Sequence, residues 1–326
     1  MERIKHKNKK YKVISLFAGI GGFDIGFENA GFNVIWANDF DKYAVQTYKA
    51  NVSENIVLGD IKLVKNQIPE HDILVGGFPC QPFSTLGKLE GFKDEERGNL
   101  FFEIIDILKT HKTKIVVLEN VKNLVKHDKG NTFKRIVQEL TDLGYDLHYQ
   151  IFNSADYGIP QRRNRIYIVG FLKEYFPDTT KFKFPEPFEL TTTTQDFLDK
   201  NVDKKYFLTK KIAETILSTG TKGYNVAPTI DLSICKTFTA TMHKMHRAGQ
   251  DNYVTDNESR TLFEDDNRIN VRRLTPNECR KLQGFPNDWK QVVSDSQAYK
   301  QFGNAVTVDV VYYIAKEIME FIEIKE

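Results

Sequence analysis

The stretch VISLFAGIGGFDIGF, residues 13–27, decides the fold expected for the rest of the chain. Its apolar, β-branched start predicts a strand, and the glycine-rich A-G-I-G-G leads into a helical pattern. Glycines let a backbone approach a ligand closely, and the first turn of a helix offers free N–H groups to an anion. The stretch therefore favours a nucleotide-like cofactor over the alternative, a tight turn that serves only packing.

Two further features refine this cofactor hypothesis. Asp39 follows the next predicted strand about 20 residues on, where a carboxylate that binds a ribose would lie. The third glycine of G-x-G-x-x-G is missing, and Phe17 precedes Ala-Gly, so the stretch differs from a standard dinucleotide site. The ring of Phe17 is placed to stack on an adenine.

Strand-like and helix-like segments alternate through the first half of the chain, which predicts an α/β fold with a mostly parallel sheet. Ligand-binding loops gather at the carboxyl ends of strands in such sheets. The predicted strands are Val13–Phe17, Asn33–Ala37, Asn55–Leu58, Asp72–Val75, Lys114–Glu119, Tyr149–Asn153 and Arg165–Gly170. The predicted helices are Phe23–Ala30, Lys42–Asn51, Leu100–Thr110 and Thr132–Leu143.

The alternation ends at the proline-containing segment Phe182–Leu190. The polar, threonine-rich chain from there to about Asn270 predicts a smaller domain of irregular structure. Helix signals return in L-T-P-N-E-C-R-K-L, with a threonine N-cap, proline at the first helical position and glutamate at the third. A long amphipathic helix is expected over Thr307–Ile324.

Composition limits the function classes. The chain has 326 residues, 40% apolar and 28% charged, which supports a sizeable folded core. The net charge of +2 is too balanced to indicate nucleic-acid binding by itself, so such a claim needs local patches. No apolar run approaches the roughly 18 residues of a membrane span, and the basic start leads into no secretory signal. We expect a cytoplasmic protein.

The stretch GGFPCQPFS, residues 76–84, places one of only three cysteines between two prolines. Cys80, Cys235 and Cys279 lie far apart without a C-x-x-C pair, so neither a disulfide framework nor a metal site is expected. A buried small hydrophobe remains an alternative. However, Cys80 follows a predicted strand in a turn stiffened by prolines, which favours a reactive thiolate at the ligand-binding edge.

Charged residues lie at the end of one other predicted strand and at the start of another. Glu119 ends the apolar segment K-I-V-V-L-E, as either a solvated strand end or a buried carboxyl group that donates a proton. Arg163 and Arg165 lead into a strand, and alternation places both on one side. Guanidinium groups in this position suit a carboxylate, a phosphate or a polarised carbonyl, against the alternative of a solvated basic strand start.

Five short motifs in this order resemble the signature motifs of the DNA (cytosine-5) methyltransferase family. They are F-A-G-I-G-G at Phe17–Gly22, P-C-Q at Pro79–Gln81, E-N-V at Glu119–Val121, Q-R-R-N-R at Gln161–Arg165 and G-N-A-V at Gly303–Val306. The resemblance covers nearly the whole chain except about Leu190 to Asn270, and the length is similar to that of compact bacterial modification enzymes. It implies a Rossmann-like catalytic domain over 1–185, completed by 290–326, and a target-recognition domain over 186–289.

The resemblance also implies catalytic roles. Cys80 would add to C6 of a cytosine flipped out of the duplex, so that C5 can accept a methyl group. Glu119 would protonate or hydrogen-bond N3, Arg165 would polarise the O2 carbonyl, and Arg163 would help to anchor the base. The loop from Gln81 to Asn99 would close over the site as a lid.

S-adenosylmethionine would be the methyl donor. Asp39 would bind its ribose hydroxyls, Phe40 would lie against the adenine, and Asp60 would take the adenine amino group. Two departures from the family pattern stand out: Ser15 where aspartate is usual, and Asp39 where glutamate is commoner. The implied cofactor-binding residues are Phe17, Gly19, Ile20, Gly22, Asp39, Phe40, Asp60, Ile61, Pro79, Leu100, Asn304 and Val306.

Double-stranded DNA would be the substrate, bound by a monomer that works beside a separate cognate restriction endonuclease. Threonine, histidine, arginine and glutamine side chains suit base edges and phosphates. The DNA-binding candidates are Ser84, Gln161, Thr237, Thr239, Thr241, His243, Arg247 and Gln250.

Three other functions compete with this hypothesis. A nucleotide-dependent oxidoreductase accounts for the glycine-rich turn but gives Cys80 and Glu119 no role. An inactive DNA-binding module would be expected to have lost one of those two residues. A methyltransferase for tRNA cytosine would carry Cys-Phe-Thr in its target region, whereas Cys235 here is followed by Lys-Thr-Phe.

Overall fold

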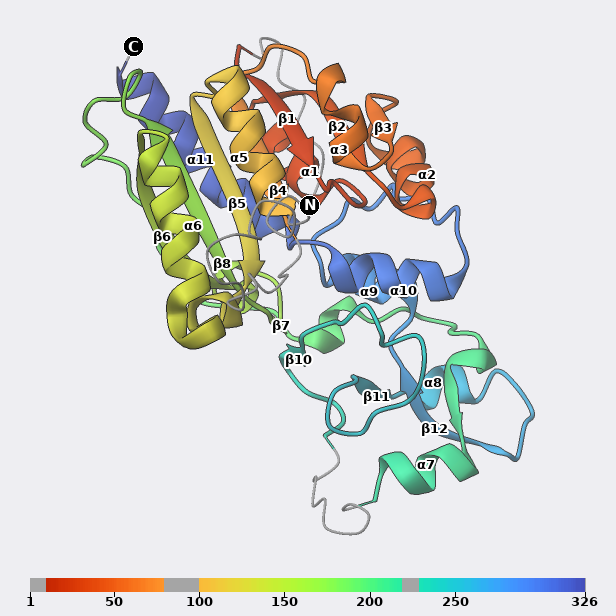
Figure 1. Cartoon of the computed structure of the whole chain (residues 1–326). Helices are drawn as coiled ribbons and strands as arrows, with labels where there is room; N and C mark the ends of the chain where they lie inside the picture. Colours follow the sequence, from red (N-terminus) through yellow and green to blue (C-terminus); the bar gives the residue numbers. More distant parts are fainter. Residues whose placement is uncertain (1–9, 79–99, 219–228, 326) are drawn as a thin grey trace. The chain divides into compact units, whose positions relative to one another are not determined.

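The computed structural model describes residues 10–78, 100–218 and 229–325 (Figure 1). Contacts between residues divide the chain into two compact units. The first, here called the sheet unit, comprises Arg3–Phe152, Asn164–Glu186 and Val310–Glu326. The second, here called the loop-rich unit, comprises Met1–Glu2, Asn153–Arg163 and Pro187–Asp309.

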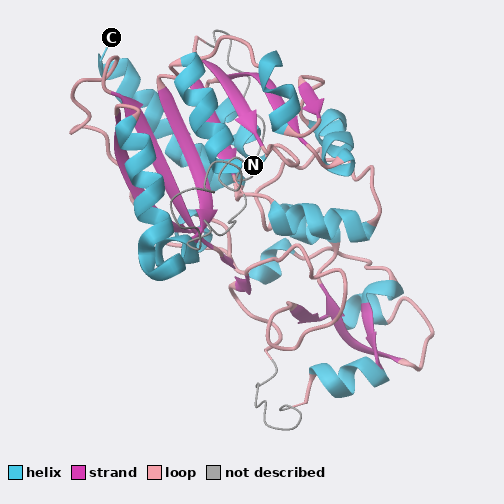
Figure 2. Ribbon diagram, in the orientation of Figure 1, coloured by secondary structure: helices cyan, strands magenta, loops and turns pink. Residues whose placement is uncertain are grey.

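A seven-stranded sheet in the order β3-β2-β1-β4-β5-β8-β6 forms the centre of the sheet unit (Figure 2). The pairs from β3 to β5 are parallel, whereas β8 runs antiparallel to β5. The mostly parallel sheet is thus confirmed, with β8 as an exception that the sequence did not indicate. The strands are β1 (Lys12–Leu16), β2 (Asn33–Asp39), β3 (Ile56–Leu58), β4 (Ile73–Gly77), β5 (Ile115–Val121), β6 (Tyr145–Asn153) and β8 (Asn164–Leu172).

Helices pack on both faces of this sheet. One hydrophobic core joins α3, α5 and α6 to the strands, with Phe101, Ile104 and Ile136 among its fully buried members. On the other face, Phe321 of α11 packs against Phe171 of β8 at 4.8 Å between ring centroids. The helices are α1 (Gly22–Asn29), α2 (Lys42–Asn51), α3 (Ile61–Val64), α5 (Leu100–His111), α6 (Asn131–Asp142) and α11 (Val308–Lys325), with 3-10 turns η1 (Lys65–Gln67) and η2 (Lys122–Gly130).

Burial explains why the central strands are mostly apolar, and in β5 the polar residues Glu119 and Asn120 lie only near its end. The first six residues of β5 are all buried, because helices cover both faces of a parallel sheet. All the strands and helices predicted for the first half of the chain are confirmed, with ends that differ by a few residues. The helix predicted after Thr275 is also confirmed, with its capping box and its proline in the first turn.

The loop-rich unit is more regular than predicted. Strands β11, β12 and β9 form an antiparallel sheet, and β10 pairs with β7. These strands are two to six residues long, too short for alternation to stand out in the sequence. The elements are η3 (Ser154–Tyr157), β7 (Gln161–Arg162), η4 (Thr194–Phe197), η5 (Lys204–Tyr206), β9 (Phe207–Thr209), α7 (Lys210–Ile216), β10 (Cys235–Lys236), β11 (Tyr253–Thr255), α8 (Asn257–Arg260), β12 (Arg268–Arg273), α9 (Pro276–Lys281) and α10 (Asp295–Asn304).

A buried ion-pair network connects these short elements. Arg272 of β12, fully buried, donates to Asp256 at 2.7 Å and to both carboxylate oxygens of Glu278 at 2.8 and 2.9 Å. Glu278 also accepts the backbone N–H groups of Thr275 and Asp199, each at 2.7 Å. A buried carboxylate needs such partners, and through them Glu278 connects the first turn of α9 with β12.

The two units divide the chain differently from the predicted domains. Asn153–Arg163 and residues 290–309 group with the loop-rich unit, although they were expected in the catalytic domain. Hydrogen bonds explain the grouping, because Gln161 donates to the carbonyl of Leu282 and Arg163 to that of Phe238. The functional division into a catalytic and a target-recognition domain stays a prediction.

No helix in the described ranges combines the length and the apolar character that a bilayer crossing requires.

We predict that Glu278→Ala lowers the free energy of unfolding by about 3 kcal/mol, because it leaves the buried Arg272 guanidinium short of its main partner. Chemical denaturation monitored by circular dichroism measures the change. Glu258→Ala, at an exposed position of α8, serves as the control and should stay within about 0.5 kcal/mol of wild type. Equal effects of the two substitutions would contradict the structural role of Glu278.

Candidate active site

The carboxylate of Asp39 ties together the loops that follow β1 and β2. Its two oxygens accept the backbone N–H groups of Gly19 and Asp41, both at 2.8 Å. Burial raises the pKa of Asp39, and these hydrogen bonds oppose the rise. Asp39, which is predicted to bind the ribose, therefore also holds the glycine-rich turn against the end of β2. Each of its carboxylate oxygens keeps a second lone pair that can accept a hydrogen bond from a ligand.

The neighbouring Asn38 extends this brace to β3. Its amide donates to the carbonyls of Val57 at 3.0 Å and Gly59 at 2.9 Å. Asn38 was not among the predicted residues, although a polar residue between an apolar predicted strand and Asp39 is a sequence signal that points to it. The structure buries this side chain and pairs it. Asn38 and Asp39 together connect the carboxyl ends of three adjacent strands.

The glycine-rich turn has room for a ligand. Phe17 and Gly19 adopt left-handed backbone conformations, with φ of 53° and 57°. A Cβ placed on Gly19 would meet nothing within 4 Å, whereas one on Gly21 would strike the side chains of Val52 and Tyr48. Gly19 thus borders open space, while Gly21 packs against α2. Gly22 opens α1, and Ile20 is buried.

The other predicted cofactor residues of the sheet unit differ in what they expose. Phe40, just beyond β2, is 74% exposed, which is rare for so large an apolar side chain and suits an aromatic ligand face. Asp60 is exposed and caps α3 through the N–H of Lys62. Ile61 is buried in the hydrophobic core, and Leu100, half-buried at the start of α5, packs against the same core.

A buried polar cluster that the sequence did not predict connects β1, α1 and α2 next to the glycine-rich turn. Ser15 and Tyr48 donate to the two carboxylate oxygens of Asp24, at 2.9 and 2.6 Å. Asp24 is completely buried, and burial raises its pKa to about 6 while the two hydrogen bonds limit the rise. Ser15, one departure from the family pattern, thus donates a hydrogen bond to a carboxylate in the first turn of α1.

Glu119 and Arg165 form an ion pair at the end of β5. The Arg165 Nε lies 3.0 Å from the Glu119 Oε1, and both side chains are mostly buried. Arg165 is opposite Val121 in the antiparallel register, so the two charged side chains are diagonal neighbours on one sheet face. Arg165 also donates to the carbonyl of Asn164. Because a guanidinium carries five donors, it retains capacity for a substrate carbonyl.

The end of β4 lies directly beside Glu119. Gly77 is opposite Glu119 in the parallel register, and a Cβ on Gly77 would lie 3.1 Å from the Glu119 Oε2. Asn120 donates to the carbonyl of Phe78 at 2.8 Å, which fixes the chain as it leaves β4. Neither residue was predicted. Pro79, Cys80 and Ser84, and the predicted lid, lie outside the described residues.

Gln161 and Arg163 are both buried in the loop-rich unit, and their predicted contacts with DNA and with the base stay predictions. Gln161 donates to the carbonyl of Leu282 at 2.7 Å and accepts from the N–H of Phe238. Arg163 is 2% exposed and donates to the carbonyls of Phe238, Gly303 and Ala305. The argument that alternation places Arg163 and Arg165 on one side of a strand was wrong, because β7 ends at Arg162 and β8 begins at Asn164.

Arg247 organises the other predicted DNA-binding residues. Its guanidinium donates to the hydroxyls of Thr239 at 2.9 Å and Thr241 at 3.1 Å, and pairs with Asp251 at 2.9 Å. Asp251, which was not predicted, is buried, and this burial raises its pKa. This geometry shows that Arg247 stabilises the loop, and its predicted contact with DNA stays a prediction.

The remaining candidates have different surroundings. Thr237 donates to the carbonyl of Arg162, and His243 contacts the carbonyl of Ala240 at 2.9 Å. Gln250 is exposed. Of the predicted set in this loop, Thr241 and Gln250 present the most exposed side chains.

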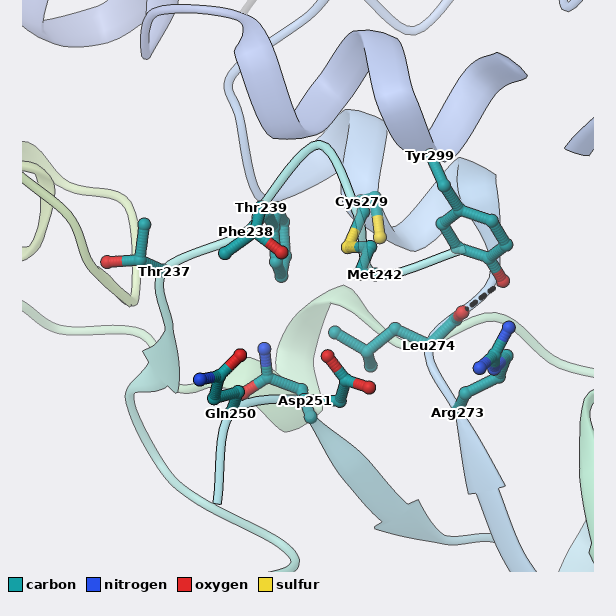
Figure 3. A pocket seen from close by; sticks show the side chains of 11 residues that line it. Thr237, Phe238, Thr239, Met242, Gln250, Asp251, Arg273, Leu274, Cys279 and Tyr299 are labelled. Atoms are coloured by element: carbon teal, nitrogen blue, oxygen red, sulfur yellow. Dashed lines mark hydrogen bonds between the residues drawn. The ribbon is translucent and has the colours of Figure 1, made fainter. Parts of the chain in front are cut away.

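A small cavity lies behind the same loop (Figure 3). Its volume of about 30 Å³ suits one or two water molecules, far below the roughly 300 Å³ of ligand pockets. Tyr299 donates to the carbonyl of Leu274 across it, and the Arg273 guanidinium lies 5.7 Å from the Tyr299 ring. The cavity is therefore a packing feature of the loop-rich unit and not a base-binding pocket.

Asn304 and Val306 belong to the loop-rich unit, and their predicted contact with the cofactor stays a prediction. The structure explains why glycine precedes them at position 303, because any Cβ there would clash with the backbone of Thr239 and Ala240. The G-N-A-V motif is thus packed tightly against the loop that contains the DNA-binding candidates.

Comparison with known proteins gives consistent matches. The family model of the C-5 cytosine-specific DNA methylases matches residues 11–320. The Type II methyltransferase M1.ScrFI of Lactococcus lactis subsp. cremoris is 41% identical over 97% of this chain and 80% of its own length. The Type II methyltransferase M.HhaI of Haemophilus parahaemolyticus is 38% identical over 94% of each chain. A crystal structure of a Spodoptera frugiperda DNMT2 mutant has the same fold, with a TM-score of 0.72 at 21% identity over 96% of this chain and 100% of that chain.

We predict that stability falls as the pH rises from about 4 to 6, because folded Asp24 retains a proton that the unfolded chain releases. The contribution is on the order of 2 to 3 kcal/mol, and Glu28 on the same helix adds to it by repulsion. Denaturation curves across this range measure the slope, which should flatten in Asp24→Asn. The exposed Asp142→Asn is the control, and an unchanged slope in Asp24→Asn would contradict the assignment.

Proposed function

This chain belongs to the C-5 cytosine-specific DNA methylase family and is a DNA (cytosine-5) methyltransferase, and on that premise we propose how its residues perform the reaction. Cys80 is the nucleophile, Glu119 and Arg165 act on the pyrimidine ring, and the loops after β1, β2 and β3 bind S-adenosylmethionine. The substrate is a cytosine flipped out of double-stranded DNA, because a thiolate cannot reach C6 inside the base stack.

The Cys80 thiolate forms a bond to C6, and the electron pair of the C5–C6 double bond moves toward C5. Glu119 donates a proton or a hydrogen bond to N3, and Arg165 donates to the O2 carbonyl, so both offset the charge that develops on the ring. C5 becomes enamine-like and accepts the methyl group that S-adenosylmethionine would supply, and the sulfur of that donor would keep the electron pair of the broken sulfur–methyl bond. Loss of the C5 proton and breakage of the bond between C6 and sulfur then restore the aromatic ring and release Cys80.

The observation that carries this proposal is the Glu119–Arg165 pair beside the end of β4. The carboxylate and the guanidinium are joined to each other on one sheet face, as they must be to meet N3 and O2 of a single base. Asn120 holds the carbonyl of Phe78, two residues before Cys80 in the sequence. No rival function gives these three features a common purpose.

The residues at the other strand ends fit S-adenosylmethionine. Open space borders Gly19, a carboxylate lies behind it at Asp39, and the exposed ring of Phe40 offers a face to the adenine. When bound, this cofactor supplies an electrophilic methyl group without a metal ion. Asp39 is one methylene shorter than the commoner glutamate, but its position is held by two backbone N–H groups.

We also propose that the enzyme acts as a monomer in the bacterial cytoplasm, as the modification partner of a separate restriction endonuclease. Two of the relatives it matches are named Type II methyltransferases. Sequencing of methylated cytosines in DNA from cells that express the protein tests this, because a modification enzyme marks one short motif at nearly every occurrence. Scattered methylation without a motif would overturn the proposal.

We predict that Cys80→Ser abolishes methyl transfer to DNA while binding of S-adenosylmethionine persists. DNA that contains 5-fluorocytosine should trap wild type in a denaturation-resistant complex, because fluorine does not leave C5 as a proton does. Radiolabelled methyl transfer and denaturing gels measure both effects, with tRNA as the comparison substrate. A covalent complex formed by Cys80→Ser would assign the nucleophile elsewhere.

We predict that Gly77→Ala slows methyl transfer about tenfold, because the new methyl group crowds the Glu119 carboxylate at 3.1 Å. The dissociation constant for S-adenosylmethionine should stay the same. Gly76→Ala is the matched control, since its Cβ would lie equally close, at 3.1 Å, to the backbone of Leu16 instead. If both substitutions slow transfer equally, strain in β4 rather than displacement of Glu119 is responsible.

A further inference from the structure

We propose that four lysines next to the candidate active site, Lys122, Lys126, Lys129 and Lys134, form a binding surface for the phosphate backbone of DNA. They lie on η2 and the first turn of α6, within the sheet unit and outside the segment expected to read sequence. We call Lys122–Lys134 the basic segment. The inference rests on the proposed function, because it assumes that DNA is the substrate.

Charge is concentrated in this segment. Its 13 residues contain four lysines and one acidic residue, Asp128, so it carries a net charge of +3, compared with +2 for the whole chain. A balanced protein that binds DNA must collect its positive charge locally, because the phosphates attract a patch and not an average.

The four lysines are exposed, and within the described ranges none of them makes an ion pair. Other lysines of the sheet unit are neutralised, as Lys65 is by Glu103 and Asp106 and Lys114 is by Asp72. The one acidic residue in the segment, Asp128, pairs with none of these lysines within the described ranges and accepts a hydrogen bond from Asn131.

The fold holds the segment in one shape. Leu124 is buried in the hydrophobic core, so the flanking Lys122 and Lys126 are held at the surface. Asp128, Lys129 and Gly130 have φ of 48°, 55° and 89°, a tight reversal that leads into α6. His127 contacts the Thr132 hydroxyl at 2.7 Å across this reversal. Such a surface loses little conformational freedom when it binds.

The location connects the segment with catalysis. Lys122 follows Glu119 by three residues at the carboxyl end of β5, and the segment runs from the tip of that strand into α6 (Figure 1). The Cα atoms of Glu119 and Lys122 are therefore separated by at most about 10 Å, the reach of three residues of extended chain. If Glu119 meets the flipped cytosine, Lys122 lies near the phosphates of that nucleotide, and the other three lysines continue the positive surface along the segment.

Phosphate contacts give affinity without sequence information. Each contact releases about one counterion, so the slope of log Kd against log salt concentration changes by about 0.9 per contact. The basic segment should therefore contribute to binding of any duplex and leave the choice of methylation site to the loop-rich unit.

The test replaces all four lysines by glutamine in the full-length protein. Fluorescence anisotropy with a mixed-sequence duplex, between 50 and 300 mM KCl, gives the salt slope. We expect the slope to shrink by about 2 to 4 and the Kd at 0.1 M salt to rise at least about tenfold. The motif methylated by the residual activity, and the affinity for S-adenosylmethionine, should not change.

A control variant carries the same charge change at the other end of β5. Lys109, Lys173, Lys181 and Lys183 are exposed, and all are replaced by glutamine. Lys173 follows β8, whose Phe171 is opposite the first residue of β5, and Lys181 and Lys183 flank Phe182, which packs on Phe171 at 5.0 Å. This variant should keep nearly the wild-type slope. A third variant carries arginine at the four positions of the basic segment. Because it keeps the positive charge, it should bind DNA about as tightly as wild type.

An unchanged slope in the basic-segment variant would overturn the proposal, and so would an equal loss in the control variant, which would assign the effect to net charge. A shift in the methylated motif would also overturn it, because the lysines would then read sequence. Methyl transfer to DNA by wild type is measured separately, so a failure of the proposed function is distinguishable from a failure of this inference.

Discussion

The antiparallel direction of β8 is the constraint on which the site depends. Arg165 lies at the start of β8, and in a parallel strand it would be at the opposite edge of the sheet from Glu119. Because β8 runs against β5, its first residues pair with the last residues of β5, and Arg165 is opposite Val121. Because one strand is reversed, a guanidinium lies beside the mostly buried Glu119 carboxylate.

The rest of the site consists of short polar links between neighbouring strand ends. Asp39 and Asn38 connect the loops of β1, β2 and β3, and Asn120 connects β5 with the residue after β4. Each link joins a side chain to backbone groups and spans one strand spacing. The packed core fixes the strands, so these links need to order only the last residues of each loop.

Much of the sheet unit could be predicted from the sequence because its strands and helices bury continuous apolar faces. The ion pair could not, since strand direction depends on tertiary pairing and leaves no mark in a single strand's composition. Glu119 and Arg165 were each predicted as site residues from their own motif, but their mutual contact was unforeseen. The hydrogen bonds of Gln161 and Arg163 to buried carbonyl groups were equally unforeseen, because partners more than 70 residues away leave no mark next to a motif.

The same ambiguity runs through the loop-rich unit. One apolar cluster there has only five buried members, and polar networks around Arg272, Arg247 and Gln161 join elements that apolar packing joins elsewhere. Arg247 donates to two threonines and an aspartate, so much of its guanidinium is engaged within its own loop. Residue type alone therefore does not separate a side chain that binds DNA from one that supports the loop. Exposed lysines such as Lys122 and Lys126 differ from Arg247, because they make no ion pair within the described ranges and retain their charge for a phosphate.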